Sequence, residues 1–155
     1  MTKRDYQADL QAKNTARAFA SNQRISQKYA TEVCREIRGK RVERAEQFLR
    51  NILVKKEFLP LVKYHGKIPH RKGDSKSGVK AGRYPVKVCE AFLNLLNSVK
   101  ANADFKGLDA ENLLIVHAFA SQGFRRFAHQ PKGKISGKGW RRKSAHIEII
   151  ARDIA

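Results

Sequence analysis

Apolar residues recur at helical spacing in the first third of the chain. Tyr29, Val33 and Ile37 lie four residues apart, and they are bounded by Ser26 and Gly39. Serine is a preferred residue at the start of a helix, and glycine is common just after its end. The spacing therefore predicts a first helix between these two residues.

Two further apolar stripes predict two more helices. The second helix begins at about Val42, and Pro60, whose ring cannot continue a helix, is expected to stop it. The third helix begins at Pro85, ends before Gly107 and carries the broadest stripe, so it is the predicted central helix. The stripes consist of Val42, Ala45, Leu49, Ile52 and Leu53 in the second helix and of Val88, Cys89, Phe92, Leu95, Leu96 and Val99 in the third.

Three other segments have the composition or the alternation of β-strands. Leu113–Ala120 is rich in β-forming residues, and Ala145–Ala151 alternates, with Ile147 and Ile149 on one face. Thr15–Arg24 alternates alanines with larger residues and predicts a weak edge strand. The chain is therefore expected to combine helices with a small number of strands.

A long basic connection joins the last two predicted strands. Residues 121–143 contain four glycines, eight basic residues and no acidic residue. Two strands joined in this way predict a β-hairpin whose far half leaves the body of the protein. A bare two-stranded ribbon is marginally stable in water, so a binding partner should order it.

A second basic segment, residues 60–84, contains seven basic residues, one acidic residue and four glycines. It has no sustained apolar period, which predicts a long loop that becomes ordered on binding. Loops of this length are uncommon unless they are functional. Gly73–Lys80 is not a phosphate-binding loop, because Val79 stands where that motif requires lysine.

The charge of the chain favours a polyanionic partner. Its 155 residues include 33 Lys and Arg against 14 Asp and Glu, which gives a net charge of +19. Nucleic acid is the first candidate, and an acidic membrane surface is the second. The length favours a single domain, 1–155, that carries the basic insert 60–84 and a basic hairpin at about 121–145.

The sequence also excludes several classes of protein. Its longest apolar runs are too short to span a membrane, and residues 1–20 have no apolar region of the kind found in secretory signals. Cys34 and Cys89 have no companion at zinc-site spacing, and their positions in apolar stripes predict core residues. We therefore predict no metal site and no cofactor.

Candidate catalytic groups are few. Histidine could do acid–base work, but no histidine has a carboxylate near it in the sequence, so no catalytic residue is predicted. Acidic residues that alternate with arginines at helical spacing are predicted to form surface ion pairs. The histidines that could serve in this way are His70, His117, His129 and His146, and the acids are Glu32, Glu36, Glu43 and Glu46.

Aromatic residues interleave with basic ones on both arms of the predicted hairpin. Residues 124–127 read FRRF, and residues 140–143 read WRRK. The arginine guanidinium can form paired hydrogen bonds with a phosphate and can stack on a ring. Aromatic side chains offer faces on which unpaired bases stack. Alternatively, Phe124, Phe127 and Trp140 pair across the hairpin and hold it together. The sequence leaves both interpretations open.

Several short motifs run in one order along nearly the whole chain. They are Ile25–Lys28 (ISQK), Ile37–Lys40 (IRGK), Gly82–Lys87 (GRYPVK), Asn102–Asp109 (NADFKGLD) and His146–Ile149 (HIEI). Together they resemble the universal large-subunit ribosomal protein family that is numbered twenty-two in the bacterial scheme and seventeen in the eukaryotic one. Ile68–Gly73 (IPHRKG) followed by Ala81–Pro85 (AGRYP) resembles the archaeal form of that family.

The resemblance implies an α+β fold, with a small body of three helices on a three-stranded antiparallel sheet and a long projecting β-hairpin. It implies a non-catalytic, cytoplasmic and ribosome-bound protein without a cofactor. The implied partners are large-subunit rRNA, neighbouring large-subunit ribosomal proteins and, at the hairpin tip, the nascent polypeptide. The body would lie near the mouth of the peptide exit tunnel, and the hairpin would reach the tunnel wall.

The residues expected to bind rRNA come from the body, the insert and the hairpin. They are Arg17, Arg24, Lys28, Arg38 and Lys40 in the body, His70, Arg71, Lys72 and Arg83 in the insert, and Arg125, Arg126, Arg141, Arg142 and Lys143 in the hairpin. The expected tunnel tip departs from the family's pattern of Pro-Arg-Ala-x-Gly-Arg. It consists of Pro131, Lys132, Gly133, Lys134, Ile135 and Ser136.

Two alternatives come from other functional classes. A free-standing nucleic-acid-binding regulator would use the helices around Gly39 as a helix-turn-helix, but most of the basic charge lies outside any single recognition helix. An RNA-acting enzyme would depend on one of the histidines, and the sequence offers no reason to choose among them.

Overall fold

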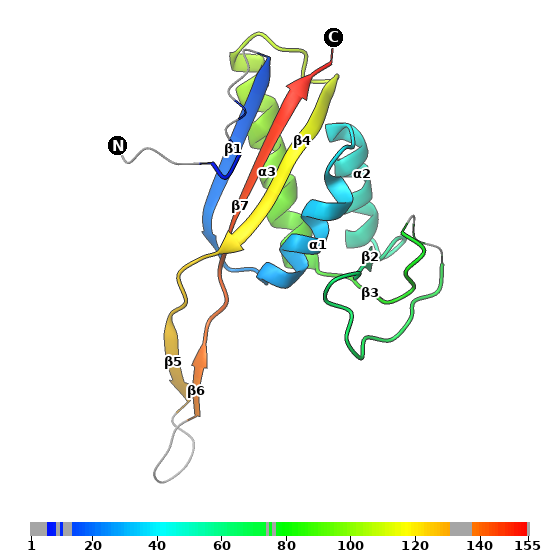
Figure 1. The fold of residues 1–155 in the computed structure, drawn as a ribbon, viewed down its shortest axis with the longest axis vertical. Helices are drawn as coiled ribbons and strands as arrows, with labels where there is room; N and C mark the ends of the chain where they lie inside the picture. The colour runs from blue at the N-terminus through cyan, green and yellow to red at the C-terminus, as the bar shows by residue number, and fades with distance from the viewer. Residues whose placement is uncertain are drawn as a thin grey trace.

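Three helices lie on one side of a three-stranded antiparallel sheet (Figure 1). This is a computed structural model, and it describes residues 6–8, 10, 14–73, 75, 77–130 and 138–154. The sheet has the order β1 (Thr15–Gln23), β7 (Ala145–Asp153), β4 (Leu113–Gln122). The helices are α1 (Gln27–Ile37), α2 (Val42–Leu53) and α3 (Val86–Phe105). Helix α3 packs against β1 and β7, α1 packs against β4, and α2 packs against α3. The expected α+β body and the edge position of β1 are confirmed.

The chain continues beyond β4 into a projecting β-hairpin that returns to β7 (Figure 1). Its strands are β5 (Phe127–Gln130) and β6 (Lys138–Arg141), which pair antiparallel with Phe127 opposite Arg141. The predicted hairpin is therefore present, and it leaves the body at the end opposite the C-terminus. The predicted tunnel tip, Pro131, Lys132, Gly133, Lys134, Ile135 and Ser136, lies outside the described residues.

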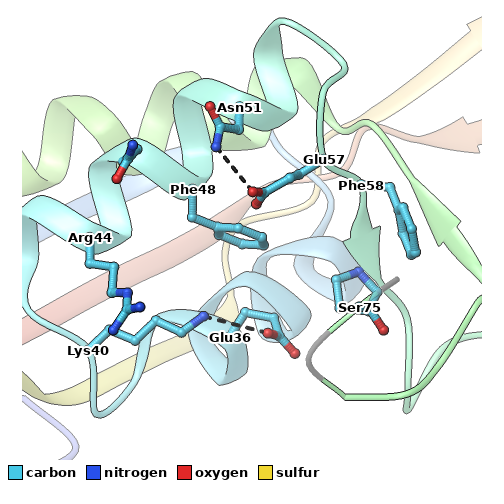
Figure 2. Close-up of a pocket in the computed structure, with 10 residues that line it drawn as sticks. Glu36, Lys40, Arg44, Phe48, Asn51, Glu57, Phe58 and Ser75 are labelled. Carbon is cyan, nitrogen blue, oxygen red and sulfur yellow. Dashed lines mark hydrogen bonds and ion pairs between the residues drawn. The ribbon is translucent and has the colours of Figure 1, made fainter. Parts of the chain in front are cut away.

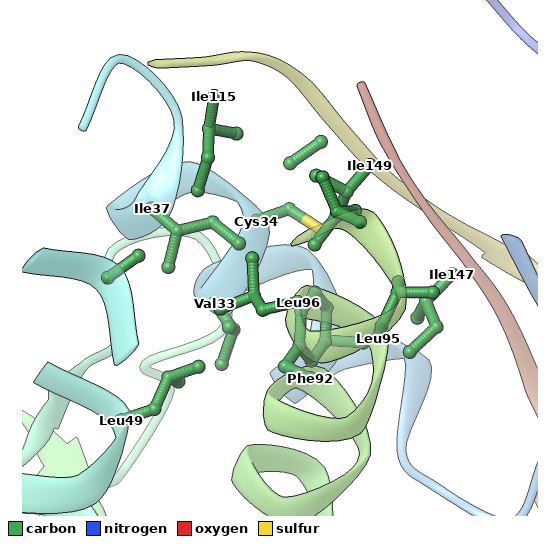
Figure 3. Packing of buried hydrophobic residues seen from close by; sticks show 14 of the residues in the cluster. Val33, Cys34, Ile37, Leu49, Phe92, Leu95, Leu96, Ile115, Ile147 and Ile149 are labelled. Carbon is green, nitrogen blue, oxygen red and sulfur yellow. The ribbon is translucent and has the colours of Figure 1, made fainter. Parts of the chain in front are cut away.

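The core lies between the sheet and helices α1 and α3 (Figure 3). Ile37 of α1, Phe92 and Leu96 of α3 and Ile147 and Ile149 of β7 are all 0% exposed. Burying a side chain of this size contributes about 1.5–3 kcal/mol to folding. The apolar stripes that predicted the helices are therefore the faces that form the core.

The inward-facing pattern of β4 changes once along the strand. Leu113 and Ile115 are buried, and after a register shift between Ile115 and His117 the buried residues are Ala118 and Ala120. One extra residue in a strand reverses which alternate positions point inward. The bulge therefore lets Leu113, Ile115, Ala118 and Ala120 all face the core although their spacing does not alternate throughout.

Helix α2 ends earlier than predicted. It stops at Leu53, and Pro60 lies in the short strand β2 (Leu59–Pro60). Lys55 has a left-handed φ of 62°, and the N–H groups of Lys55 and Lys56 donate to carbonyl oxygens of the last helical turn. These bonds form a Schellman termination without its usual glycine. The choice of Pro60 as the stop was wrong, because the helix closes before reaching it.

The insert 60–84 has more structure of its own than predicted. Strand β2 pairs antiparallel with β3 (Gly82–Arg83), and His70 forms an isolated bridge with Ala81. Leu61 N–H also donates to Ala81 O at 2.9 Å. These bonds hold the two ends of the insert together within the chain. The described part of the insert is mostly loop, as predicted, and the two short strands at its ends are the structure that the prediction missed.

Glu32 ties the insert to α1. Its side chain is 1% exposed, and its Oε1 accepts the backbone N–H groups of Lys63 at 2.8 Å and Tyr64 at 2.9 Å. Its Oε2 forms an ion pair with Arg35. The predicted ion pair of Glu32 therefore forms, but its surface location was wrong, because this carboxylate is buried as the acceptor of a backbone turn.

The other helical acids differ in their surroundings. Glu46 is also buried, at 8% exposed, and its carboxylate lies 2.8 Å from Lys100 Nζ, which links α2 to α3. Glu36 forms the expected ion pair, with Lys40, at 3.7 Å. Glu43 is exposed and forms no ion pair with the residues that the structure describes. Glu46 also forms an ion pair at helical spacing, with Arg50 at 4.0 Å, so only the predicted surface location was wrong, because the carboxylate bridges two packed helices.

Both cysteines lie in the core, as predicted. Cys34 in α1 is 4% exposed and Cys89 in α3 is 0% exposed. Burial removes the thiolate from water and raises the pKa of each thiol to about 12. Their role is packing, because only an ionised thiol is an effective nucleophile or metal ligand.

We expect neither thiol to be alkylated by iodoacetamide at pH 8 while the chain is folded. Because both pKa values rise from 9.0 to about 12 on folding, their contribution to stability is full below pH 9 and is lost as the pH rises toward 12. Mass spectrometry of the native chain and of the urea-unfolded chain measures the labelling. Rapid labelling of the native chain would contradict the expectation.

Candidate nucleic-acid interface

The hairpin is fixed to the body at a root formed by Asn22, Gly123, Phe124 and Ser144. Asn22 Oδ1 accepts the Phe124 N–H at 2.9 Å, and the Ser144 hydroxyl donates to Phe124 O at 2.7 Å. Gly123 N–H donates to Ser144 O at 3.1 Å. Asn22 has a φ of 47°, a conformation that asparagine adopts more readily than most residues. These contacts fix the direction in which the hairpin leaves the sheet.

Replacing Gly123 by alanine is expected to destabilise the fold by about 1–3 kcal/mol, the usual cost of overpacking. A Cβ atom at this position would collide with Ser144 Oγ and come within 2.9 Å of Asn22 Oδ1. Both atoms bond Phe124, so the collision opens the root. Urea unfolding measures the loss. Gly139→Ala in β6 is the matched control, because its Cβ would meet only His129, at 3.8 Å. Equal stability of the two variants would contradict the expectation.

A cleft of about 690 Å³ lies beside the root, between the start of α1, the start of α3 and the base of the hairpin. We call it the root cleft. It brings one predicted body residue, Arg24, together with four predicted hairpin residues, and no acidic residue lines it. Its cations are Arg24, Lys87, Arg126, Arg141, Arg142 and Lys143.

The charges of the root cleft are not neutralised within the described part of the chain. The side chains of Arg24, Lys87, Arg126 and Lys143 form no hydrogen bond or ion pair with any described residue. By contrast, cations of the body such as Lys100 lie against buried carboxylates. The cleft is therefore a basic surface whose charge no acidic side chain of the described residues neutralises, and such a surface suits a polyanion.

The aromatic residues of the hairpin do not pair with one another among the described residues. Phe124, Phe127 and Trp140 are 70%, 65% and 53% exposed. Instead, the Arg141 guanidinium lies 4.7 Å from the Phe127 ring centre, and that of Arg142 lies 5.9 Å from the Trp140 ring centre. The interpretation that the three rings hold the hairpin together by pairing was wrong, because each ring instead faces an arginine or solvent. Arg125 is exposed and lies outside the lining of the root cleft.

The predicted residues of the insert form a separate group. Arg71 Nε donates to Gly82 O at 3.1 Å, so this side chain ties the insert to β3. His70, Lys72 and Arg83 are exposed, and their side chains form no hydrogen bond or ion pair with described residues. None of the four lines the root cleft. The insert therefore offers exposed charge without a cleft of its own.

Two of the predicted body residues have structural partners. Arg38 donates to Ala118 O at 2.7 Å, which ties the end of α1 to β4. Lys40 pairs with Glu36 and lies 4.8 Å from the Phe48 ring centre.

The other two body residues lie beside tyrosines. Arg17 lies over the Tyr6 ring at 5.0 Å, and Lys28 over the Tyr64 ring at 5.5 Å. Lys28 is exposed, whereas Arg17 is half-buried.

A second cavity, of about 350 Å³, lies between α1, α2 and the insert (Figure 2). Its lining carries both acidic and basic side chains. Glu36 faces Lys40, and Glu57 accepts a hydrogen bond from Asn51 at 3.2 Å. Because two carboxylates contribute to this cavity, it is less suited to a polyanion than the root cleft.

His117 has a carboxylate partner that the sequence did not reveal. Its Nε2 lies 2.9 Å from Glu148 Oε1, across the pairing of β4 and β7. Glu148 is 3% exposed and also accepts the Gln7 N–H at 3.2 Å. The pair therefore anchors the N-terminal segment to the sheet, and it presents no open site for a substrate.

Sequence reasoning missed Lys87 and Asn22. Lys87 follows Pro85 in the GRYPVK motif, but its position beside the hairpin arises only because α1 and α3 begin at the same place. Asn22 carried one usable signal, since asparagine is among the few residues that adopt a positive φ readily.

Within the described residues, no helix has both the length and the apolar character needed to cross a membrane. A family model described as ribosomal protein L22p/L17e matches residues 18–152. The large ribosomal subunit protein uL22 of Ignicoccus hospitalis is 39% identical, and the match covers 96% of each chain. Those of Methanococcus vannielii and Methanoculleus marisnigri are 38% and 36% identical, covering 97% and 100% of each chain.

Proposed function

The chain belongs to the ribosomal protein L22p/L17e family in its archaeal-type form, and we propose that it binds and organises large-subunit rRNA as a structural constituent of the large ribosomal subunit. This family is one of structural ribosomal proteins, not of enzymes. Ribosomal proteins of the large subunit are the neighbours that this proposal implies, and the ribosome is the place where the chain would reside.

The root cleft is the observation that carries the rRNA-binding proposal. Six cations line it without an acidic residue, and four of them have no hydrogen-bond or ion-pair partner among the described residues. Burying such a cluster against protein would leave its charge uncompensated, whereas RNA phosphates neutralise it and release counterions. Exposed cations of the insert and Arg125 would extend the contact beyond the cleft.

We also propose that the hairpin reaches the wall of the nascent-peptide exit tunnel, with the body near the tunnel mouth. Support comes from the family resemblance and from the way the hairpin leaves the body at one end (Figure 1). In this arrangement residues 131–136 would be the segment nearest to the nascent chain.

Sedimentation of the tagged chain from a lysate of its native cells, through a sucrose gradient in stringent salt, tests the function. We expect near-stoichiometric recovery with the large subunit. Recovery at the top of the gradient, or spread over all RNA and DNA, would contradict the proposal. A free-standing regulator would also be scarce relative to ribosomes, so the same fractions distinguish the two classes.

A further inference from the structure

We propose that the root cleft binds an unpaired nucleotide of RNA, with the base stacked on the exposed Trp140 and Phe124 rings and the phosphate on the cations beside the start of α1. This inference rests on the proposed function, and it names the RNA element that the cleft takes. The alternative is that the cleft binds the outer surface of an RNA duplex, and the proposal excludes this.

The shape of the cleft favours a single nucleotide over a helix. Its volume of about 690 Å³ lies in the range of small-ligand sites, and its walls come from β1, α1, α3 and both arms of the hairpin. A duplex presents phosphates on its outside and hides the faces of its bases inside the stack. A base that has left the stack offers a face to a concave aromatic site.

The aromatic wall of the cleft is available for stacking. Trp140 and Phe124 both line it, and they are 53% and 70% exposed although each is a large apolar ring. Among the described residues, the only ring contact of Trp140 is with the Arg142 guanidinium, and Phe124 has none. Arginine planes and aromatic faces are the two surfaces on which unpaired bases stack.

The cations of the cleft suit a phosphate. Arg24, Lys87 and Lys143 line it and have no carboxylate partner among the described residues. Ser26, at the start of α1, also lines the cleft, and its side chain makes no capping hydrogen bond. Neither α1 nor α3 has an acidic residue in its first turn, so their free N–H groups add to the positive field.

Two of the polar groups that could read a base edge are already engaged. Asn22 Oδ1 and the Ser144 hydroxyl both bond the Phe124 backbone, which fixes the Phe124 main chain at the cleft. Recognition would therefore depend mainly on stacking and charge, and would tolerate different bases.

The single tryptophan of the chain makes this inference directly measurable. The full chain is titrated at low salt with a single-stranded hexa-adenylate, with a blunt RNA duplex and with inorganic polyphosphate, while Trp140 fluorescence is recorded. We expect the hexa-adenylate to quench the emission, and the duplex and polyphosphate to bind without comparable quenching. Equal quenching by polyphosphate would show that the cleft binds anions without stacking a base, and it would overturn the inference.

Variants separate stacking from folding. We expect Phe124→Leu to weaken hexa-adenylate binding by about 5- to 150-fold, the usual effect of removing one base–aromatic stack. Phe105→Leu is the matched control, because Phe105 is 93% exposed and lies outside the cleft. By calorimetry, Trp140→Leu should also weaken binding, whereas Trp140→Phe should retain most of it. Equal affinities for the Phe124 and Phe105 variants would overturn the inference.

Binding of large-subunit rRNA is measured in parallel with the same protein. Tight rRNA binding without a Trp140 response to hexa-adenylate would overturn the nucleotide site and leave the proposed function standing. Loss of rRNA binding itself would overturn both.

Discussion

Raising the salt concentration from 50 to 200 mM is expected to weaken binding of the isolated chain to large-subunit rRNA by about 10³- to 10⁵-fold, if six to ten phosphates are neutralised as on duplex DNA. Six cations at the root cleft, together with the exposed cations of the insert and Arg125, provide that number of contacts. The cause is counterion release, since each neutralised phosphate frees condensed cations into solution. Filter binding over a series of salt concentrations gives the slope of log K against log salt.

Two triple variants test whether this charge acts locally. Replacing Arg24, Lys87 and Lys143 of the root cleft by glutamine should reduce the slope by about 2 to 3, because each phosphate contact contributes about 0.7–0.9. The control replaces the exposed residues Arg44, Lys55 and Lys56 by glutamine, which removes the same charge from a surface outside the cleft. An equal reduction in both variants would show that net charge, rather than the cleft, governs binding.

Helix ends were predictable where glycine marks them. Gly39 and Gly107 have φ values of 75° and 70°, a conformation that glycine adopts without strain, and both follow predicted helices. Lys55 adopts the same conformation without being glycine, so the end of α2 was missed. The pairing of β2 with β3 was missed for another reason, because strands of two residues have no periodicity to detect.

The candidate site was predictable only where its residues are neighbours in the sequence. Arg141, Arg142 and Lys143 form one run beside Trp140, and their composition alone favoured RNA. Lys87 belongs to a motif in a distant helix, and only the shared starting point of α1 and α3 brings it to the hairpin. Glu32 was misjudged because its spacing to Arg35 is that of a surface ion pair, whereas the insert folds over it.

Replacing Glu32 by alanine is expected to lower the free energy of unfolding by about 2–6 kcal/mol, since it leaves two polar groups unsatisfied and each costs about 1–3 kcal/mol. The substitution leaves the N–H groups of Lys63 and Tyr64 without the acceptor that now lies 2.8 Å and 2.9 Å away. Urea denaturation measures the change. Hydrogen exchange should accelerate more at these two amides than at other amides when the variant is compared with the unsubstituted chain, because these two amides connect the insert to α1.

Two further variants distinguish the hydrogen bonds of Glu32 from its charge. Glu32→Gln keeps a carbonyl oxygen for both amides and loses only the ion pair with Arg35, whose side chain is 42% exposed, so this variant should recover most of the stability. Glu43→Ala removes an exposed acid of α2 and should change stability little. If Glu32→Gln were as unstable as Glu32→Ala, the buried charge rather than the two backbone bonds would hold the insert.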